Sequence, residues 1–254
     1  MGYNTNGYSH TSGIKNEEKL RDYLQRGAAK QLYPQLSSSY EVLKRGGTKF
    51  KQDMEIQDKS GVILISAKKK DVIEKGSFDW LNSSAALSES EVLSEFARKI
   101  SDIPNVEDVY GPAKLEGFIA SMDALRNLPS SDLSKILKKH INQKNKNMKI
   151  MITESLGGRN WEYSFIESPL YHAIENYTPV ICLGRGIESA SVEFETPAGN
   201  RVDLGLRIRL TTNNGIGALL GQSKSNKSAR AVVKFQQDDI PGLIAGLGNK
   251  IRTF

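Results

Sequence analysis

Residues with catalytic side chains follow one another at short spacing in the segment between Gly46 and Lys70. Asp53 precedes a Lys-Ser-Gly turn, and Ser66 and Lys68 follow it at the end of an apolar run. Hydrolysis of a phosphodiester requires a carboxylate that holds Mg²⁺ and a positive group beside the attacking water. Because Asp53 and Lys68 are residues of these two types, the segment could perform that reaction.

The same segment predicts a β-hairpin that would position these side chains. Residues i and i+2 of a strand share a face, so Ser66 and Lys68 should point the same way, as should Asp53 and Glu55. The apolar run at 62–65 would anchor the second strand in a core and fix the place where its polar end emerges. We therefore expect Asp53 and Lys68 to meet at one edge of the hairpin.

The hairpin, with Asp53 followed by Ser66-Ala67-Lys68, resembles the active site of the PD-(D/E)xK superfamily, the restriction-endonuclease-like nucleases. The resemblance implies that Asp53 and the carbonyl of Ala67 bind Mg²⁺, for which Mn²⁺ would substitute, and that Lys68 orients the attacking water. The chain departs from the pattern twice, because Gln52 replaces the family's proline and Ser66 replaces its second acid. The other interpretation of the segment is an exposed hairpin whose charges are solvated.

A second carboxylate is available from the helix that we predict from about Lys15 to Leu32. At about 100° per residue, Glu17 points within about 60° of the apolar stripe formed by Leu20 and Leu24. A carboxylate on that side is costly unless it is paired or bound to metal, and members of the resembled superfamily often draw an acid from this helix. Glu17 or Glu55 would then replace the missing acid. Alternatively, Glu17 only complements the positive N-terminus of its helix.

The composition is that of an ordinary globular protein with room for a full core, because 38% of its 254 residues are hydrophobic and 25% are charged. The formal charge of +6 suits a polyanionic partner. One cysteine and three widely separated histidines argue against an internal disulfide and a zinc site. The absence of an apolar signal segment or a membrane-length stretch predicts a cytoplasmic protein, and the resemblance implies a bacterial, archaeal or phage origin.

Along the chain, we expect one α/β nuclease domain with a restriction-endonuclease-like mixed central sheet flanked by helices. Ser88 and Glu91 predict a capping box for a helix that ends near Ser101. The predicted parts are a flexible arm (1–13), the start of the catalytic core (14–87), a helical lobe (88–147) and a β-rich, DNA-reading remainder (148–254).

Basic residues outside the catalytic pair are candidates for DNA contacts. Segment 201–210 alternates strictly, with apolar residues on one face and Arg207 and Arg209 on the other. A two-stranded ribbon with arginines fits the major groove, where arginine can bridge guanine O6 and N7. Further candidates are Lys49 and Lys70 beside the hairpin, and Lys224 and Lys227 in a polar loop. Each of these also fits an ordinary solvated surface.

The resemblance therefore implies a Mg²⁺-dependent endonuclease that cleaves double-stranded DNA by direct attack of water. A sequence-specific Type II restriction endonuclease is the first expectation, and a structure-specific phage or recombination nuclease of the junction-resolvase kind is the second. Ser66 also keeps open a nucleic-acid-binding protein without catalysis. A restriction enzyme would often act as a homodimer and be accompanied by a cognate DNA methyltransferase.

Overall fold

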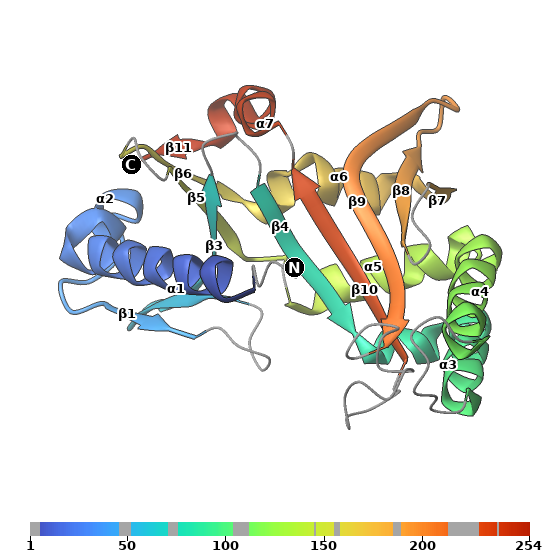
Figure 1. The fold of residues 1–254 in the computed structure, drawn as a ribbon. Coiled ribbons are helices and arrows are strands. Elements are labelled where there is room, and N and C mark those ends of the chain that lie inside the picture. The colour runs from blue at the N-terminus through green and yellow to red at the C-terminus, as the bar shows by residue number, and fades with distance from the viewer. Residues whose placement is uncertain are drawn as a thin grey trace. The chain divides into compact units, whose positions relative to one another are not determined.

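The computed structural model describes residues 6–45, 52–70, 76–103, 112–144, 146–154, 158–184, 189–212, 229–237 and 239–254, and its fold is drawn in Figure 1. The chain forms two compact units and passes between them repeatedly. The first unit comprises Met1–Gly76, Ile141–Tyr171 and Asp238–Phe254, and the second comprises Ser77–His140 and His172–Gln237. Each unit contains its own sheet and helices, so the predicted α/β class is confirmed.

Within its described residues, the first unit is built on a six-stranded sheet in the order β1-β2-β3-β5-β6-β11. The central pair β3 and β5 is parallel, and every other neighbouring pair is antiparallel, so the sheet is mixed as predicted. The predicted hairpin is formed by β2 and β3. The strands are β1 (Glu41–Lys44), β2 (Met54–Asp58), β3 (Gly61–Lys70), β5 (Lys149–Glu154), β6 (Asn160–Ser164) and β11 (Arg252–Thr253).

Helix α1 (Asn6–Tyr23) packs against β1 and β3, as Figure 1 shows, and continues through a π-helical segment (Leu24–Ala28) into α2 (Ala29–Leu32). The predicted apolar stripe is buried, because Leu20 and Leu24 join the core that the sheet residues Met54, Ile56 and Ile65 form. Burial of this stripe fixes α1 over one face of the hairpin.

Helix α1 begins at Asn6, well before the predicted start near Lys15, so residues 6–13 of the predicted arm form its first turns. The arm was predicted from polar composition, but no proline interrupts this stretch. Once packing anchors a helix further along, each added residue contributes one more hydrogen bond without a new nucleation cost. The helix can therefore extend over residues whose composition alone would not start one.

The remaining helical elements of the first unit are α7 (Ile240–Leu247) and two 3₁₀ turns, Phe165–Glu167 and Gly248–Lys250. The side chain of Asp239 caps α7 by accepting a hydrogen bond of 2.9 Å from the backbone N–H of Gly242. One boundary between the units falls within α5 (Ser130–Lys144) and another within α6 (Pro169–Asn176).

The second unit contains a five-stranded sheet in the order β4-β10-β9-β8-β7. The predicted alternation of β9 is confirmed, because Leu206, Ile208 and Leu210 are buried whereas Arg207 and Arg209 are exposed. The strands are β4 (Gly76–Ser83), β7 (Thr178–Leu183), β8 (Ser189–Glu195), β9 (Arg201–Thr212) and β10 (Ala229–Gln237).

Helices α3 (Glu91–Asp102) and α4 (Pro112–Asn127) pack on each other, and α4 also packs on β7, β8 and β9 of the same unit. The predicted capping box is wrong, because Ser88 lies in a 3₁₀ turn (Ser84–Glu89) and the N-cap of α3 is Ser90. The reason is that the buried side chains of α3, which recur at helical spacing, begin only at Leu93. Helices α3 and α4, which fall within the predicted helical lobe (88–147), belong to the same compact unit as β7–β10.

Candidate active site

Asp53 is held in place by its backbone at the start of β2. Its N–H donates a hydrogen bond of 2.8 Å to the carbonyl of Ile65, and its own carbonyl accepts one of 2.8 Å from the N–H of Arg45. The neighbouring pair Met54 and Ile65 is in register, which puts Asp53 opposite Ser66 on β3. Two strands therefore fix where the carboxylate of Asp53 emerges.

The Asp53 carboxylate gathers the predicted residues of β3 around one oxygen. Its Oδ2 accepts hydrogen bonds of 3.1 Å from Ser66 Oγ and 2.7 Å from the N–H of Ala67, and Lys68 Nζ lies 3.8 Å away. Ser66 is buried, and the side chains of Asp53 and Lys68 are 23% and 15% exposed. The predicted meeting of Asp53 and Lys68 is confirmed, and both groups remain within reach of solvent.

Strand β5 and helix α1 fix the end of β3 that carries Lys68. Thr153 of β5 donates a hydrogen bond from its Oγ1, which lies 3.2 Å from the carbonyl of Lys68 and 2.9 Å from Oδ1 of Asn16. Asn16 is the α1 residue that precedes Glu17. This contact anchors the relevant turn of α1 beside the catalytic end of the hairpin.

The carboxylate of Glu17 lies within electrostatic reach of Asp53 and Lys68. Burial raises its pKa above the ordinary value, the negative charge of Asp53 raises it further, and Lys44 and Lys68 act in the opposite direction. Lys44 Nζ lies 3.7 Å from Oε2 of Glu17. Because α1 begins at Asn6, Glu17 is in the middle of the helix. The alternative interpretation, in which Glu17 complements the helix N-terminus, is therefore wrong.

Glu55, the other candidate for the second acid, is engaged elsewhere. Its Oε1 accepts a hydrogen bond of 2.6 Å from Gln52, and its Oε2 accepts bonds of 2.9 Å from Arg45 Nε and 3.0 Å from Gln57. Burial alone would raise the pKa of Glu55, but these hydrogen bonds outweigh burial and lower it. Of the two candidates, Glu17 is the carboxylate that approaches Asp53.

The donors of this site suit a hard divalent cation. The carboxylates of Glu17 and Asp53, the carbonyl of Ala67 and the hydroxyl of Ser66 are oxygen donors of the kind that Mg²⁺ prefers. The mutual repulsion that raises the pKa of Glu17 would be relieved by a cation. Within the described ranges, no group of three or more His, Cys, Asp and Glu residues could hold a metal ion. Mg²⁺ usually keeps several waters, so two carboxylates are a sufficient protein contribution.

The predicted DNA contacts are described only in part. Arg207 and Arg209 are exposed on β9 in the second unit, where they pair in register with Ser191 and Ser189 of β8. The side chain of Lys70 lies outside the described part of the chain. The same holds for the whole of Lys49, Lys224 and Lys227.

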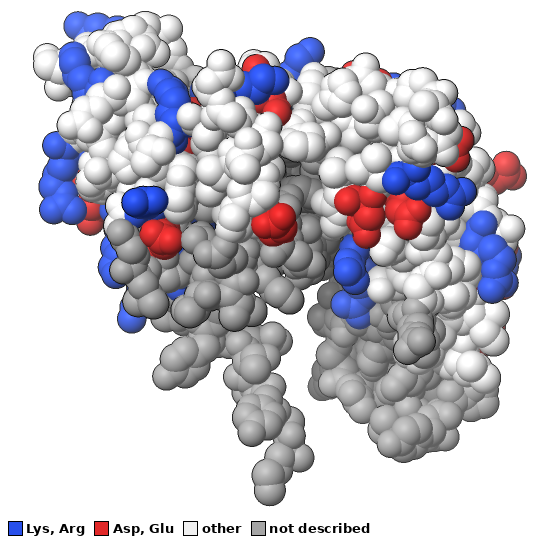
Figure 2. Space-filling view, turned by 90° about the horizontal axis from the view of Figure 1, so that it is seen from above, with Lys and Arg blue, Asp and Glu red and all other residues white. Residues whose placement is uncertain are grey.

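Charges of both signs share the molecular surface. On the face drawn in Figure 2, the side chains of Lys and Arg are interspersed with those of Asp and Glu rather than gathered in one stripe. Among the described residues, no helix has both the length and the apolarity needed to cross a membrane. The net charge of +6 is therefore weaker evidence for a DNA surface than the local contacts around Asp53.

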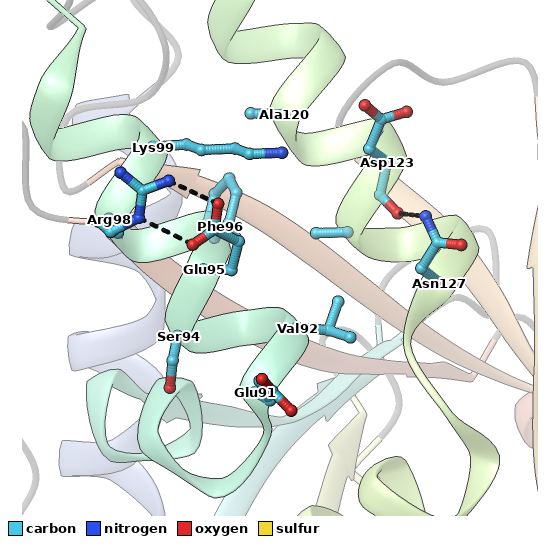
Figure 3. A pocket seen from close by; sticks show the side chains of 11 residues that line it. Glu91, Val92, Ser94, Glu95, Phe96, Arg98, Lys99, Ala120, Asp123 and Asn127 are labelled. Carbon is cyan, nitrogen blue, oxygen red and sulfur yellow. Dashed lines mark hydrogen bonds and ion pairs between the residues drawn. The ribbon is translucent and has the colours of Figure 1, made fainter.

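A pocket of about 550 Å³ lies in the second unit between α3 and α4 (Figure 3). Its wall includes the buried ring of Phe96, Arg98 is bound to Glu95, and Lys99 extends toward α4. It contains none of the predicted catalytic, metal-binding or DNA-binding residues. The full lining is Glu91, Val92, Ser94, Glu95, Phe96, Arg98, Lys99, Ala120, Asp123, Ala124 and Asn127.

Two residues beside the candidate site were not predicted, namely Asn16 and Thr153. They are bonded to each other across 137 positions of the chain, so no local spacing identifies them. Comparisons of the chain with models of known families, with curated proteins and with solved structures give no match. Function must therefore be argued from the geometry around Asp53.

Proposed function

We propose that this protein is a Mg²⁺-dependent endonuclease that hydrolyses phosphodiester bonds of double-stranded DNA. The observation that carries the proposal is the approach of Lys68 Nζ to within 3.8 Å of Asp53 at the end of the hairpin, with Glu17 within electrostatic reach of both. The carboxylates of Asp53 and Glu17 repel each other, and both are near Lys68. This arrangement suits metal-assisted hydrolysis of a phosphate ester. The mixed sheet with α1 over its hairpin suits the restriction-endonuclease-like fold within this proposal.

In the proposed mechanism, Asp53 and Glu17 would hold Mg²⁺, and the carbonyl of Ala67 would be a further donor. When bound, the ion would supply Lewis-acid stabilisation of the charge that develops on the phosphate. Lys68 lies 3.8 Å from Asp53, so its ammonium group can donate to the attacking water and favour loss of a proton from that water. The hydrogen bond from Thr153 to the carbonyl of Lys68 keeps this strand end in place.

Within this activity, sequence-specific cleavage of the Type II restriction kind is our first choice. Arg207 and Arg209 project from the exposed face of β9, whose other face is buried, and arginine side chains can bridge O6 and N7 of guanine. Strand β9 lies between β8 and β10 in a five-stranded sheet, so the predicted two-stranded ribbon is wrong. Structure-specific cleavage, as by a junction resolvase, is the alternative within the same chemistry. The two differ in the products expected from a defined plasmid, namely discrete fragments or preferential cutting of branched DNA.

A second candidate is a DNA-binding protein without catalysis, and Ser66 is the observation that favours it. Serine provides a hydroxyl where the resembled nucleases have a carboxylate, so the site has one fewer negative charge for a metal ion. Such a protein would bind DNA with a strong dependence on salt and leave it intact in Mg²⁺ or Mn²⁺.

The test is cleavage of plasmid and long linear DNA in Mg²⁺, with EDTA as the blank. Asp53→Asn and Lys68→Met should each lower the rate at least about 10²-fold and shift the melting temperature by no more than about 4 °C. The controls are Asp22→Asn and Lys19→Met, which make the same changes at exposed positions of α1. Both control proteins should cut DNA at the wild-type rate. Normal cutting by either catalytic-site variant would overturn the assignment, and intact DNA with the wild type would favour the second candidate.

A further inference from the structure

Arg45 lies in line with the catalytic residues across the first three strands of the sheet. Lys44 and Met54 are in register, and the N–H of Arg45 donates to the carbonyl of Asp53, so Arg45 stands opposite Asp53. Asp53 in turn stands opposite Ser66. Directly opposite residues of neighbouring antiparallel strands share a face, and their Cβ atoms lie about 5 Å apart. A cationic side chain therefore flanks the proposed metal ligand on the side away from Lys68.

The guanidinium of Arg45 is held by a buried carboxylate. Glu55 is 8% exposed and accepts from Arg45 Nε at 2.9 Å, while the amides of Gln52 and Gln57 bind the same carboxylate. A buried carboxylate requires a partner of opposite charge, so Glu55 restricts Arg45 to a narrow range of orientations. The Arg45 side chain is nevertheless 32% exposed, so a ligand can reach it.

We propose that Arg45 binds a backbone phosphate of the DNA duplex and that Glu55 is a positioning residue for it. This inference rests on the proposed function, because it takes a phosphodiester as the substrate. The guanidinium that Glu55 holds through Nε is planar, and its N–H geometry matches two phosphate oxygens. The proposed site also needs such a cation, because the carboxylates of Asp53 and Glu17 repel an incoming polyanion.

Glu55 lies close to Asp53 in the sheet but binds Arg45 instead of joining the proposed metal site. Arg45 stands opposite one acid, Asp53, and is bound by the other, Glu55, two residues along the same face. The ion pair with Glu55 fixes Arg45 beside Asp53 through its Nε. Asp53 is bound instead by Ser66, Ala67 and Lys68.

The experiment measures binding of a fluorescent duplex by anisotropy in EDTA, where Mg²⁺-dependent cleavage cannot occur, over a series of salt concentrations. Arg45→Met should weaken binding about ten-fold and reduce the slope of log K against log salt by about 0.9, the value for one phosphate contact. Arg21→Met removes the same charge from an exposed position of α1 and should change neither quantity by a comparable amount. Equal effects of the two variants would overturn the role of Arg45.

Glu55 is tested by Glu55→Gln, which removes a negative charge. If Glu55 acts only through its charge, the variant binds DNA more tightly than the wild type. If it positions Arg45, the variant binds more weakly while its salt slope stays near the wild-type value, because Arg45 keeps its charge. Weaker binding is the expected result, and tighter binding would overturn the positioning role.

A double variant protects the test against misfolding, because Arg45→Met alone leaves the buried Glu55 without its cation. Arg45→Met with Glu55→Gln removes both charges and should still show the reduced salt slope. These measurements do not depend on cleavage. If Asp53→Asn cuts DNA normally while Arg45→Met loses its phosphate contact, the catalytic assignment fails and this inference stands. The reverse pattern overturns this inference alone.

Discussion

The Oγ atom of Ser66 donates a hydrogen bond of 3.1 Å to Oδ2 of Asp53, at the position where the resembled nucleases carry their second acid. Ser66 is 1% exposed, so its hydroxyl fills a buried space beside the carboxylate. A second carboxylate in that space would meet Asp53 at close range, and two such groups do not both ionise easily without a cation. Serine therefore avoids a repulsion in the metal-free protein and removes a ligand from the metal-bound one.

Ser66→Asp should make the stability of the protein depend on divalent cations. In EDTA the two neighbouring carboxylates repel each other, so we expect the variant to melt several degrees below the wild type. For a chain of this size, each 1 kcal/mol of lost stability lowers the melting temperature by about 2–4 °C. Saturating Mg²⁺ should recover most of the loss, since a ligand at about 100 times its Kd stabilises by about 2.7 kcal/mol. Ser66→Asn is the neutral control. Equal responses of both variants to Mg²⁺ would show that no ion binds beside Asp53.

Glu55 should contribute to the acid sensitivity of the fold. Burial opposes ionisation, but the hydrogen bonds from Gln52, Arg45 and Gln57 prevail and hold the pKa of Glu55 below its unfolded value of about 4.3. Between the native and the unfolded pKa, the unfolded chain binds more protons than the native protein. The contribution of Glu55 to the free energy of unfolding is therefore complete above about pH 5 and is lost as the pH falls through the native pKa. The urea midpoints of wild type and Glu55→Gln should therefore differ at neutral pH and converge in acid. A constant difference down to about pH 3 would contradict this role.

The hairpin of β2 and β3 could be predicted from sequence because its information is local. The two-residue period of a strand places Ser66 and Lys68 on one face, and the helical period of α1 places Glu17 near its apolar stripe. These rules need no knowledge of distant segments. For this reason, the meeting of Asp53 and Lys68 followed from spacing alone.

Features that depend on long-range pairing could not be predicted in this way. The bond between Arg45 and Glu55 requires the register of β1 on β2, which the loop between these strands does not specify. Strand β11 has only two residues, Arg252–Thr253, and pairs with β6, which is about ninety positions earlier in the chain. The division into two interleaved units likewise follows from contacts between distant segments.

The pairing of β11 with β6 depends on a buried ion pair between Arg252 and Glu162. The Glu162 side chain is 2% exposed and accepts from Arg252 Nε at 2.7 Å, while Arg252 Nη2 lies 2.6 Å from the same oxygen. Tyr33 donates to the other oxygen at 3.2 Å, and Lys149 Nζ lies 3.8 Å from it. Burial raises the pKa of Tyr33 and the charge of Glu162 raises it further, so the phenol remains a donor.

Arg252→Ala should cost about 3 kcal/mol, the lower end of the range for breaking a buried pair, because the arginine side chain itself is 44% exposed. The measurement is the urea midpoint at constant slope. Lys250→Ala is the matched control, since Lys250 pairs with Glu167 at the surface and should cost at most about 1 kcal/mol. Similar costs for the two variants would show that Arg252 does not stabilise the C-terminal strand.

Lys44 should compete with a divalent cation for the carboxylate of Glu17. Its Nζ lies 3.7 Å from Oε2 of Glu17 and 3.6 Å from Oε1 of Glu18, so the ammonium group neutralises a proposed metal ligand. Two unit charges about 4 Å apart interact by about 1 kcal/mol in water, which corresponds to about a five-fold change in Kd. Lys44→Gln should therefore bind Mn²⁺ about five-fold more tightly at low salt, as measured by calorimetry.

Two further variants decide whether the Lys44 effect acts through Glu17. Lys19→Gln removes the same charge from an exposed position of α1 and should leave Mn²⁺ affinity nearly unchanged. Glu17→Gln should weaken Mn²⁺ binding and also abolish most of the gain from Lys44→Gln, because the lysine then has no proposed ligand to neutralise. If the gain from Lys44→Gln persists in the Glu17→Gln background, the lysine acts only through the general field of the protein. Glu17 would then not be a ligand of the proposed metal ion.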